Sequence, residues 1–426
     1  MATDSEENIL GRIKRLESSG LRTFASDRPL VIDRASGAWL YDPAGRAYLD
    51  FGGSFAVTTT GHCHPRVVAA IQAQAEKLIH CPSAYPSALR ATFLEAIESI
   101  TAPLFGAVSI LPAMTGAMAN EMALSLARWR KPGSEIVTFS GSYFGRSVGA
   151  AGFAGKAQYR QALGIAAGGH YAPFPYPLRH GSHATDFAMD YLESITAPGG
   201  GAGEIGAVIL EPIQGNGGLV IPPPDFLPRL RAFCDRTGAL LILDEIQSGC
   251  GRTGRMWAVE HAGVVPDLMT IGKGIGGNMG VAAVVGRPES MKWKPDAYSS
   301  TFLTNHVALA AAIAAIAVIK EDRLPERSRA LGTTRLEKLR QAVRDTRHVG
   351  EVRGLGLWFA FEFVDGDGKP DGARAARVTA KLRDDGVIVG GGGYAGNVIK
   401  VAPSLTISEP DLDDGLAKVV AAIQQH

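Results

Sequence analysis

Short apolar segments alternate with helical segments through the middle of this sequence, and this alternation limits the possible folds more than any other feature. Helices are expected at Met118–Arg130 and Asp225–Thr237. Five strand candidates are apolar on both faces and bounded by Gly or Pro: Glu135–Phe139, Gly206–Leu210, Leu240–Asp244, Asp267–Ile271 and Ala282–Val285. The alternation predicts an α/β fold with a mostly parallel sheet, in which ligands bind beyond the carboxyl ends of the strands.

The two ends of the chain have a different pattern. Residues 33–51 are typical of a hairpin of two aromatic-rich strands. Beyond about residue 310 a long helix is expected, followed by a strand, a helix and a strand at Leu357–Phe363, Arg374–Asp385 and Val398–Val401. We therefore expect a large α/β domain over residues 61–305 and a smaller α+β domain from residues 1–60 and 306–426. The run Gly390–Gly393 is predicted to be a flexible loop, or a mobile loop bordering a site.

Charge and composition exclude several classes of protein. Lys+Arg is 43 and Asp+Glu is 42, so no basic excess is available for nucleic acid or anionic lipid. Hydrophobic residues make up 46%, which excludes a disordered chain. The most apolar stretch, Val307–Ile319, is shorter than the roughly 18 residues of a membrane span and is predicted to be a buried helix.

The cysteines and the first residues favour a cytoplasmic protein. None of the four cysteines forms a C-x-x-C pair, and they are too sparse for a disulfide framework, so reduced thiols are expected. The N-terminal stretch is polar and has no apolar segment typical of a signal peptide. No metal site is predicted.

Charged residues follow two of the predicted strands. Leu240–Asp244 is followed by Glu245 and Gln247, and Lys273 comes two residues after Ile271. Because the ends of parallel strands open onto one crevice, Asp244 and Lys273 would face the same ligand. A structural Asp–Lys ion pair, or a solvated lysine, is the alternative interpretation.

A candidate anion-binding site follows from the stretch LPAMTGAMANE, residues 111–121. Thr115 is a good N-cap, and the small Gly116 and Ala117 leave the first helix amides open, which favours an anion such as phosphate. An ordinary capped helix is the alternative. The glycine-rich GKGIGGNMG, residues 272–280, does not have the spacing of a nucleotide-binding loop. Together, a phosphate site, a carboxylate and a reactive amine suit pyridoxal phosphate, because Lys forms Schiff bases and Asp tunes a pyridinium nitrogen.

The sequence resembles the class III aminotransferases of the subgroup II, ornithine/4-aminobutyrate type, which are fold type I pyridoxal-phosphate enzymes. The resemblance covers nearly the whole chain, from Trp39-Leu40-Tyr41-Asp42 and Gly61-His62-Cys63-His64-Pro65 to Ala402-Pro403, and is most specific over Leu240–Lys273. It implies a mostly parallel seven-stranded sheet between helices and an aminotransferase activity.

The resemblance also implies roles for individual residues. Lys273 matches the Schiff-base lysine, Asp244 the carboxylate on the pyridine nitrogen, and Gln247 the residue near the phenolic oxygen. The other matches are Gly116 and Ala117 at the phosphate, Tyr143 stacked on the ring, Glu211 beside the cofactor, and Thr301 at the phosphate of the neighbouring subunit's cofactor. The last match implies a homodimer with active sites at the subunit interface, and a tetramer is compatible with it.

Four further residues are predicted to contact substrate. The family motif E-P-I-Q-G-E ends here in Asn216, and the arginine expected in the late strand is Lys400, so the family's Glu–Arg pair is absent. Lys400 keeps a positive charge but lacks the bidentate guanidinium. It is either a carboxylate anchor or a strand-end surface lysine. Arg146 matches an arginine that binds a second carboxylate, with a structural arginine as the alternative, and Phe55 falls near a substrate-contacting aromatic, with a core residue as the alternative.

We therefore expect an aminotransferase that moves an amino group from an amino acid or ω-amino acid to a 2-oxo acid in ping-pong fashion through Lys273. The missing Glu–Arg pair leaves other reactions of the same cofactor open: a decarboxylating transaminase, an epimerase or an aminomutase. A non-enzymatic cofactor-binding protein is the third alternative, and the retention of Lys273, Asp244 and Gln247 argues against it.

Overall fold

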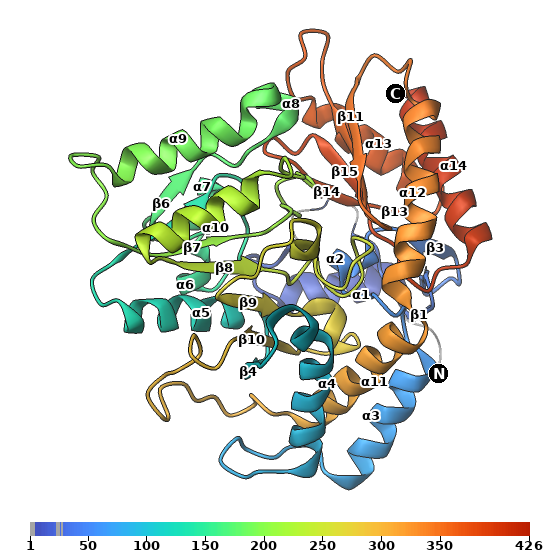
Figure 1. The fold of residues 1–426 in the computed structure, drawn as a ribbon. Helices are drawn as coiled ribbons and strands as arrows, with labels where there is room; N and C mark the ends of the chain where they lie inside the picture. Colours follow the sequence, from blue (N-terminus) through green and yellow to red (C-terminus); the bar gives the residue numbers. More distant parts are fainter. Residues whose placement is uncertain (1–4, 23–25, 27–28) are drawn as a thin grey trace.

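The computed structural model of the chain describes residues 5–22, 26 and 29–426. Its centre is a seven-stranded sheet formed by β4 (Ser109–Ala113), β5 (Glu135–Phe139), β6 (His170–Ala172), β7 (Ile205–Leu210), β8 (Leu240–Asp244), β9 (Leu268–Ile271) and β10 (Ala282–Gly286). The strand order is β4-β10-β9-β8-β7-β5-β6 (Figure 1). Strand β10 is antiparallel to both of its neighbours, and the other adjacent pairs are parallel. The prediction of a mostly parallel seven-stranded sheet is confirmed.

The prediction that Ala282–Val285 is a parallel strand is wrong. Only residues 272–281 separate β9 from β10. A parallel return needs a crossover of about a dozen residues or more, so a connection this short forces the antiparallel direction. The strand is nevertheless buried on both faces, which is why its apolar pattern looked like that of a parallel strand.

Helices cover both faces of the sheet: α5 (Gly116–Arg130) lies on one side, and α9 (Ala184–Thr196) and α10 (Phe226–Thr237) lie on the other (Figure 1). Alternate residues of a strand therefore join different cores. In β7, Ala207 and Ile209 belong to the core that contains Met122 of α5, whereas Val208 belongs with Phe226 of α10. This double covering leaves the strand ends as the place where polar groups can gather.

Two four-stranded sheets lie outside this layer, and both use the ends of the chain. One contains β1 (Arg34–Ser36), β2 (Trp39–Tyr41), β3 (Ala47–Asp50) and β13 (Val387–Ile388); the other contains β11 (Val349–Gly354), β12 (Phe359–Phe363), β15 (Val398–Val401) and β14 (Gly390–Gly392). The predicted hairpin is present as β2 and β3, and β13 pairs in parallel with β3. Both chain ends thus share a sheet, while the domain division after residues 60 and 305 stays a prediction.

The prediction of a flexible loop at Gly390–Gly393 is wrong over its first three residues, which form β14. This strand pairs with β15, placing Gly390 opposite Lys400 and Gly392 opposite Val398. A Cβ atom at Gly392 would lie 3.1 Å from Cε of Lys400. The role of these glycines is therefore to let the backbone of β14 lie close to the long side chain of Lys400, and not to make the segment flexible.

The predicted buried helix at Val307–Ile319 is present as α11, and among the described helices none is long and apolar enough to cross a membrane. The remaining helices are α1 (Glu6–Leu16), α2 (Gly53–Ala56), α3 (Pro65–Lys77), α4 (Ala88–Phe105), α6 (Val148–Ala151), α7 (Ala157–Gln161), α8 (Pro177–His180), α11 (His306–Glu321), α12 (Leu324–Ala342), α13 (Gly372–Asp384) and α14 (Glu409–Gln425).

Candidate active site

Asp244 is the last residue of β8, and its carboxylate is held inside the protein. The residue is 5% exposed. Its Oδ2 accepts a hydrogen bond from Asn120 Nδ2 at 2.8 Å, and its Oδ1 accepts one from the Ile246 amide at 2.9 Å. Burial raises the pKa of Asp244 to about 6, although both hydrogen bonds and the positive charge of Lys273 act to lower it. The carboxylate is therefore ionised at neutral pH and faces a site with little water.

Lys273 reaches the same edge from the neighbouring strand. Strands β8 and β9 are parallel, with Asp244 opposite Thr270, and Lys273 follows the end of β9. Its backbone has φ 46°, a left-handed conformation that is strained for a residue with a side chain. Burial lowers the pKa of the Lys273 amine, and the charges of Asp244 and Glu211 oppose that change. The fold thus brings the predicted carboxylate and amine to one place.

Glu211, which follows β7, is the second carboxylate at this edge. Its Oε1 accepts a hydrogen bond from the Tyr143 amide at 3.0 Å, and its Oε2 accepts one from the Gly215 amide at 2.9 Å. Burial and the nearby Asp244 raise the pKa of Glu211 to about 7, while the two amides and Lys273 lower it. Glu211 therefore fixes the backbone that carries Tyr143 and the start of the 211–216 loop.

The predicted anion site lies at the N-terminus of α5. Thr115 is the N-cap, and its Oγ1 accepts a hydrogen bond from the Met118 amide at 3.2 Å. A Cβ atom at Gly116 would lie only 2.7 Å from Cδ1 of Ile246, and one at Gly145 would lie 2.4 Å from Cβ of Ala117. Glycines are thus required for this turn to pack closely. The first amides of the helix and its dipole make the turn suitable for phosphate.

Gln247 contacts the turn that carries Phe55. Gln247 Nε2 donates to the Phe55 carbonyl oxygen at 3.4 Å. The alternative of a core residue is wrong for Phe55, because this side chain is 64% exposed. Ser54, Phe55 and Ala56 all have φ between 46° and 66°, an uninterrupted left-handed turn. A strained backbone of this kind is rarely retained unless the surrounding structure holds it. The turn leaves the Phe55 side chain exposed to solvent.

Lys400 is buried, so the interpretation as a strand-end surface lysine is wrong. Only 8% of the residue is exposed, and its Nζ donates to the Gly215 carbonyl oxygen at 2.8 Å. Asn216, in the same loop, donates from Nδ2 to the Tyr159 hydroxyl. The rings of Tyr143 and Tyr159 pack edge to face at 5.3 Å. The 211–216 loop therefore links Lys400 to the aromatic side of the site.

Arg146 and Thr301 are exposed in the single chain. The Arg146 guanidinium lies 4.8 Å from the centre of the Tyr159 ring, which places it beside the same aromatic pair. Thr301 occupies a turn that precedes α11, and its contact with a neighbouring subunit stays a prediction. His306 holds that turn: its Nδ1 lies 2.9 Å from the Thr304 carbonyl oxygen, which can only accept, so Nδ1 donates, and its Nε2 lies 2.8 Å from the Ser87 hydroxyl.

Sequence reasoning missed Asn120, which orients the central carboxylate. Its Nδ2 donates to Asp244 and to the Phe144 carbonyl oxygen, and its Oδ1 accepts from the Thr270 hydroxyl at 2.8 Å. The sequence feature that could have identified Asn120 is its side-chain amide, which stands alone beside Ala119 and Met122 on an otherwise apolar face of α5. A buried polar side chain at such a position needs partners, and here the partners are the functional groups.

A buried amine, a buried carboxylate and the open first amides of α5 at one edge of this sheet are the groups that a fold type I pyridoxal-phosphate enzyme requires. The model of the family "Aminotransferase class-III" matches residues 23–423, and the chain belongs to this family. It is 38% identical to the 5-aminovalerate aminotransferase DavT of Pseudomonas putida and to the 4-aminobutyrate aminotransferase GabT of Escherichia coli, in each case over 91% of this chain and 92% of the relative.

Two further similarities are informative. A leucine/methionine racemase of Thermococcus litoralis is 35% identical over 98% of this chain and 95% of that protein. The crystal structure of the ornithine aminotransferase of Toxoplasma gondii superposes with a TM-score of 0.85 at 28% identity, covering 100% of this chain and 96% of that one. The protein is therefore a pyridoxal-phosphate-dependent aminotransferase. Its sheet edge offers the anion site, carboxylate and amine that this cofactor requires.

Replacing Asn120 by Ala should weaken cofactor binding about tenfold, because one of the two hydrogen bonds that stabilise the ionised Asp244 is lost. The pKa of Asp244 should rise further, so retention of the cofactor should fall off at a higher pH than in the wild type. Cofactor affinity can be measured by fluorescence titration across pH. Thr270→Val removes a contact of Asn120 but leaves the bond to Asp244, and should have a smaller effect. Equal effects of the two substitutions would contradict the assignment.

Proposed function

We propose that the protein transfers an amino group from an ω-amino acid, or a related amino acid, to a 2-oxo acid. The observation that carries this proposal is the Lys273 amine, buried within reach of the charges of Asp244 and Glu211 at the ends of three adjacent strands. The relatives named for 5-aminovalerate and 4-aminobutyrate support a donor whose amine is distant from its carboxylate. Arg146, Lys400, Phe55 and Asn216 are the candidates for substrate contact.

The residues around the cofactor have distinct roles in this proposal. When bound, pyridoxal phosphate supplies a ring that withdraws electrons from the substrate carbon. The ionised Asp244 would keep a proton on the ring nitrogen, and Gly116 and Ala117 would hold the phosphate with their amides. Tyr143 would pack on the ring face, and Gln247 would hold the phenolic oxygen. Glu211 positions Tyr143 by accepting a hydrogen bond from the Tyr143 backbone amide.

Lys273 has two roles. In the resting enzyme its amine would hold the cofactor covalently, which needs a neutral amine as nucleophile. Once the substrate amine has taken its place, the freed Lys273 amine would accept the proton of the substrate carbon and hold it for return. The lowered pKa of this amine suits both roles, because more of it is neutral near pH 7 than of an ordinary lysine. The same residue then acts in reverse with the 2-oxo acid.

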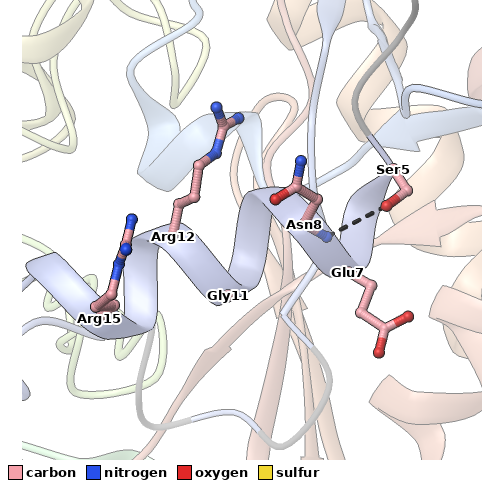
Figure 2. A pocket seen from close by; sticks show the side chains of 6 residues that line it. All are labelled: Ser5, Glu7, Asn8, Gly11, Arg12 and Arg15. Atoms are coloured by element: carbon pink, nitrogen blue, oxygen red, sulfur yellow. Dashed lines mark hydrogen bonds between the residues drawn. The ribbon is translucent and has the colours of Figure 1, made fainter.

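We also propose a homodimer, with Thr301 reaching the phosphate in the partner's site. The support is an exposed apolar patch around the turn that carries Thr301: Leu78, Ile79, Tyr85 and Phe302 are all exposed, and the Phe302 ring lies 5.1 Å from that of His80. Apolar patches of this kind mark protein–protein contacts. Within the described part of the chain, α1 has no buried residue, and residues of this helix line a shallow surface hollow (Figure 2).

A cytoplasmic location is part of the proposal. All four cysteines, Cys63, Cys81, Cys234 and Cys250, are free thiols. Burial raises the pKa of Cys234 and of Cys250 to about 12, which keeps both as unreactive thiols. A reducing compartment suits such a set.

Racemisation of an amino acid is the second candidate function. The similarity to a leucine/methionine racemase over nearly the whole chain favours it, as does the absence of the family's glutamate at Asn216. The same Lys273 and Asp244 would serve the removal of the proton, and a proton returned from solvent to the opposite face of the substrate carbon would complete the reaction without a second substrate.

Borohydride reduction of the holoenzyme should place the covalent cofactor adduct on Lys273, as determined by peptide mapping. Lys273→Ala should retain the cofactor without covalent attachment and lose at least about a thousandfold in kcat, because both nucleophile and proton carrier are removed. Lys292→Ala is the matched control, since Lys292 is an exposed lysine, whereas Lys273 is desolvated by burial. An adduct on another lysine, or wild-type turnover by Lys273→Ala, would refute the role of Lys273.

The donor can be identified by following the absorbance of the cofactor with 4-aminobutyrate, 5-aminovalerate, ornithine and acetylornithine separately. An ω-amino donor should convert the aldehyde form to the amine form, and pyruvate, 2-oxoglutarate or glyoxylate should reverse the conversion, because the two half-reactions share one site. If instead a single enantiomer of leucine becomes racemic with no 2-oxo acid present, the second candidate function is correct and the first is not.

Mixing an inactive variant with one that binds the cofactor weakly should test the shared site. Thr301→Ala should weaken cofactor binding about tenfold through loss of a hydrogen bond to a charged phosphate. In a mixed dimer with Lys273→Ala, one site combines an intact Lys273 with an intact Thr301 from the other chain. Unfolding and refolding the variants together should therefore restore a high-affinity active site in about half of the dimers. No recovery, in dimers verified by mass measurement, would show that Thr301 serves its own subunit's site or none.

A further inference from the structure

The turn over residues 53–56 has a backbone conformation that residues with side chains rarely adopt. Gly53, Ser54, Phe55 and Ala56 have φ values of 55°, 46°, 66° and 61°. Residues other than glycine visit this left-handed region singly, so three in succession are unfavourable. Glycine is required at position 53, because a Cβ atom there would lie 2.3 Å from the Ala402 carbonyl oxygen. Such a run persists only where other contacts hold it, and strained segments cluster at functional sites.

Backbone hydrogen bonds close this turn but do not explain its handedness. The Ala56 amide donates to the Gly52 carbonyl oxygen at 3.1 Å, and the amides of Val57 and Thr58 donate to the Gly53 carbonyl oxygen at 2.8 Å and 3.2 Å. A right-handed turn could make similar bonds with less strain. Contacts from surrounding side chains must therefore select the left-handed form.

The carboxylate of Asp50 makes the side-chain contact to the turn. Asp50 is the last residue of β3 and is 2% exposed. Its Oδ2 accepts a hydrogen bond from Ser54 Oγ at 3.1 Å and lies 2.9 Å from His62 Nε2. A buried carboxylate without such partners is costly. The left-handed turn therefore brings the Ser54 hydroxyl to a group that needs it.

His62 is itself held in place by the connection between β1 and β2. The His62 amide donates to the Gly37 carbonyl oxygen at 2.8 Å, and the Gly37 amide donates to the His62 carbonyl oxygen at 2.9 Å. Arg252 adds a buried positive charge: burial lowers the pKa of its guanidinium to about 10, and the negative charge of Asp50 opposes this change. Asp50 is thus supported by a fixed imidazole and a buried cation.

The turn controls two groups that border the candidate active site. The Phe55 side chain is largely exposed, so its direction is set by the backbone rather than by packing in a core. The Phe55 carbonyl oxygen accepts a hydrogen bond from Gln247 Nε2 at 3.4 Å. A change in the turn would therefore move the Phe55 ring and release Gln247 together.

We propose that Asp50 and His62 are positioning residues that set the length of amino donor this site accepts. Together they hold the left-handed turn, which places the Phe55 ring against the carbon chain of the donor and keeps the Phe55 carbonyl on Gln247. The inference rests on the proposed function, because it names what selects the donor of that reaction. Neither Asp50 nor His62 touches the substrate, and no covalent bond changes at either residue.

A double-mutant cycle tests whether His62 acts through Phe55. Phe55→Ala should raise the ratio of kcat/KM for 5-aminovalerate to kcat/KM for 4-aminobutyrate about tenfold, because a shorter side chain leaves room for one more methylene. His62→Leu should raise the same ratio severalfold. In the Phe55→Ala background, His62→Leu should change the ratio less than about twofold, because the ring that it positions is absent. Full multiplication of the two effects would contradict positioning through Phe55.

Three further variants separate the contact with Asp50 and the backbone strain from a general loss of stability. His62→Gln keeps an N–H group that can reach Asp50 and should restore the wild-type ratio. Ala56→Gly added to His62→Leu should restore part of the preference, because glycine adopts a positive φ without strain. His183→Leu, which breaks an exposed contact with Asp186, is the matched control and should keep the wild-type ratio.

Hydrogen exchange of the holoenzyme tests the turn without any substrate. The amides of residues 56–58 close the turn, so they should exchange about tenfold faster in His62→Leu and in Ser54→Ala than in the wild type, and at the wild-type rate in His62→Gln. Unchanged exchange in both His62→Leu and Ser54→Ala, or an unchanged donor ratio in His62→Leu, refutes the proposal. Failure of the proposed function is distinguishable, because neither donor would then convert the cofactor in the wild type, whereas the difference in exchange would remain.

Discussion

Burying the Asp244 carboxylate at the end of β8 is unfavourable by itself, and the surrounding structure compensates for it. An isolated ion in the interior loses its hydration, and this loss must be offset by hydrogen bonds and opposite charge. Asn120 and the Ile246 amide supply the hydrogen bonds, and Lys273 supplies the charge. A cationic ring would complete the compensation, so the site without cofactor holds more negative charge than it can satisfy alone. Burial, and after it the nearby Asp244, raises the pKa of Glu211 to about 7.

The parts of this arrangement that follow from strand ends could be predicted from sequence, and the parts that depend on packing could not. Asp244 and Lys273 end adjacent parallel strands, so their meeting follows from the alternation of strands and helices. The direction of β10 depends on the length of the connection between β9 and β10. The apolar pattern of the strand itself carries no information about that length. Asn120 lies in the middle of a helix, where an amide gives no signal of what it faces. The burial of Lys400 requires β14 to pair with β15 beside it. This pairing is a tertiary contact that the local sequence around Lys400 does not predict.

The sheet that carries Lys400 is fixed to the 211–216 loop region by buried charges. Arg353 of β11 lies 2.8 Å from Glu362 of β12 and donates to the carbonyl oxygens of Gly218 and Leu219. Burial alone would raise the pKa of Glu362, but Arg353 and further hydrogen bonds hold it below its ordinary value. This pair therefore ties the C-terminal sheet to the segment that follows Asn216, so the positions of Lys400 and Glu211 are set together.

A buried arginine elsewhere in the chain shows how differently the two basic side chains respond to burial. Arg252 is a fully buried guanidinium that donates to the carbonyls of Leu357 and Pro403, and among the described residues its Nε and Nη2 have no hydrogen-bond partner. Burial lowers the pKa of Arg252, yet only to about 10, so the charge persists at any physiological pH. Burial lowers the pKa of Lys400 to about 7, so this buried lysine can lose its charge near neutral pH where the buried arginine keeps it.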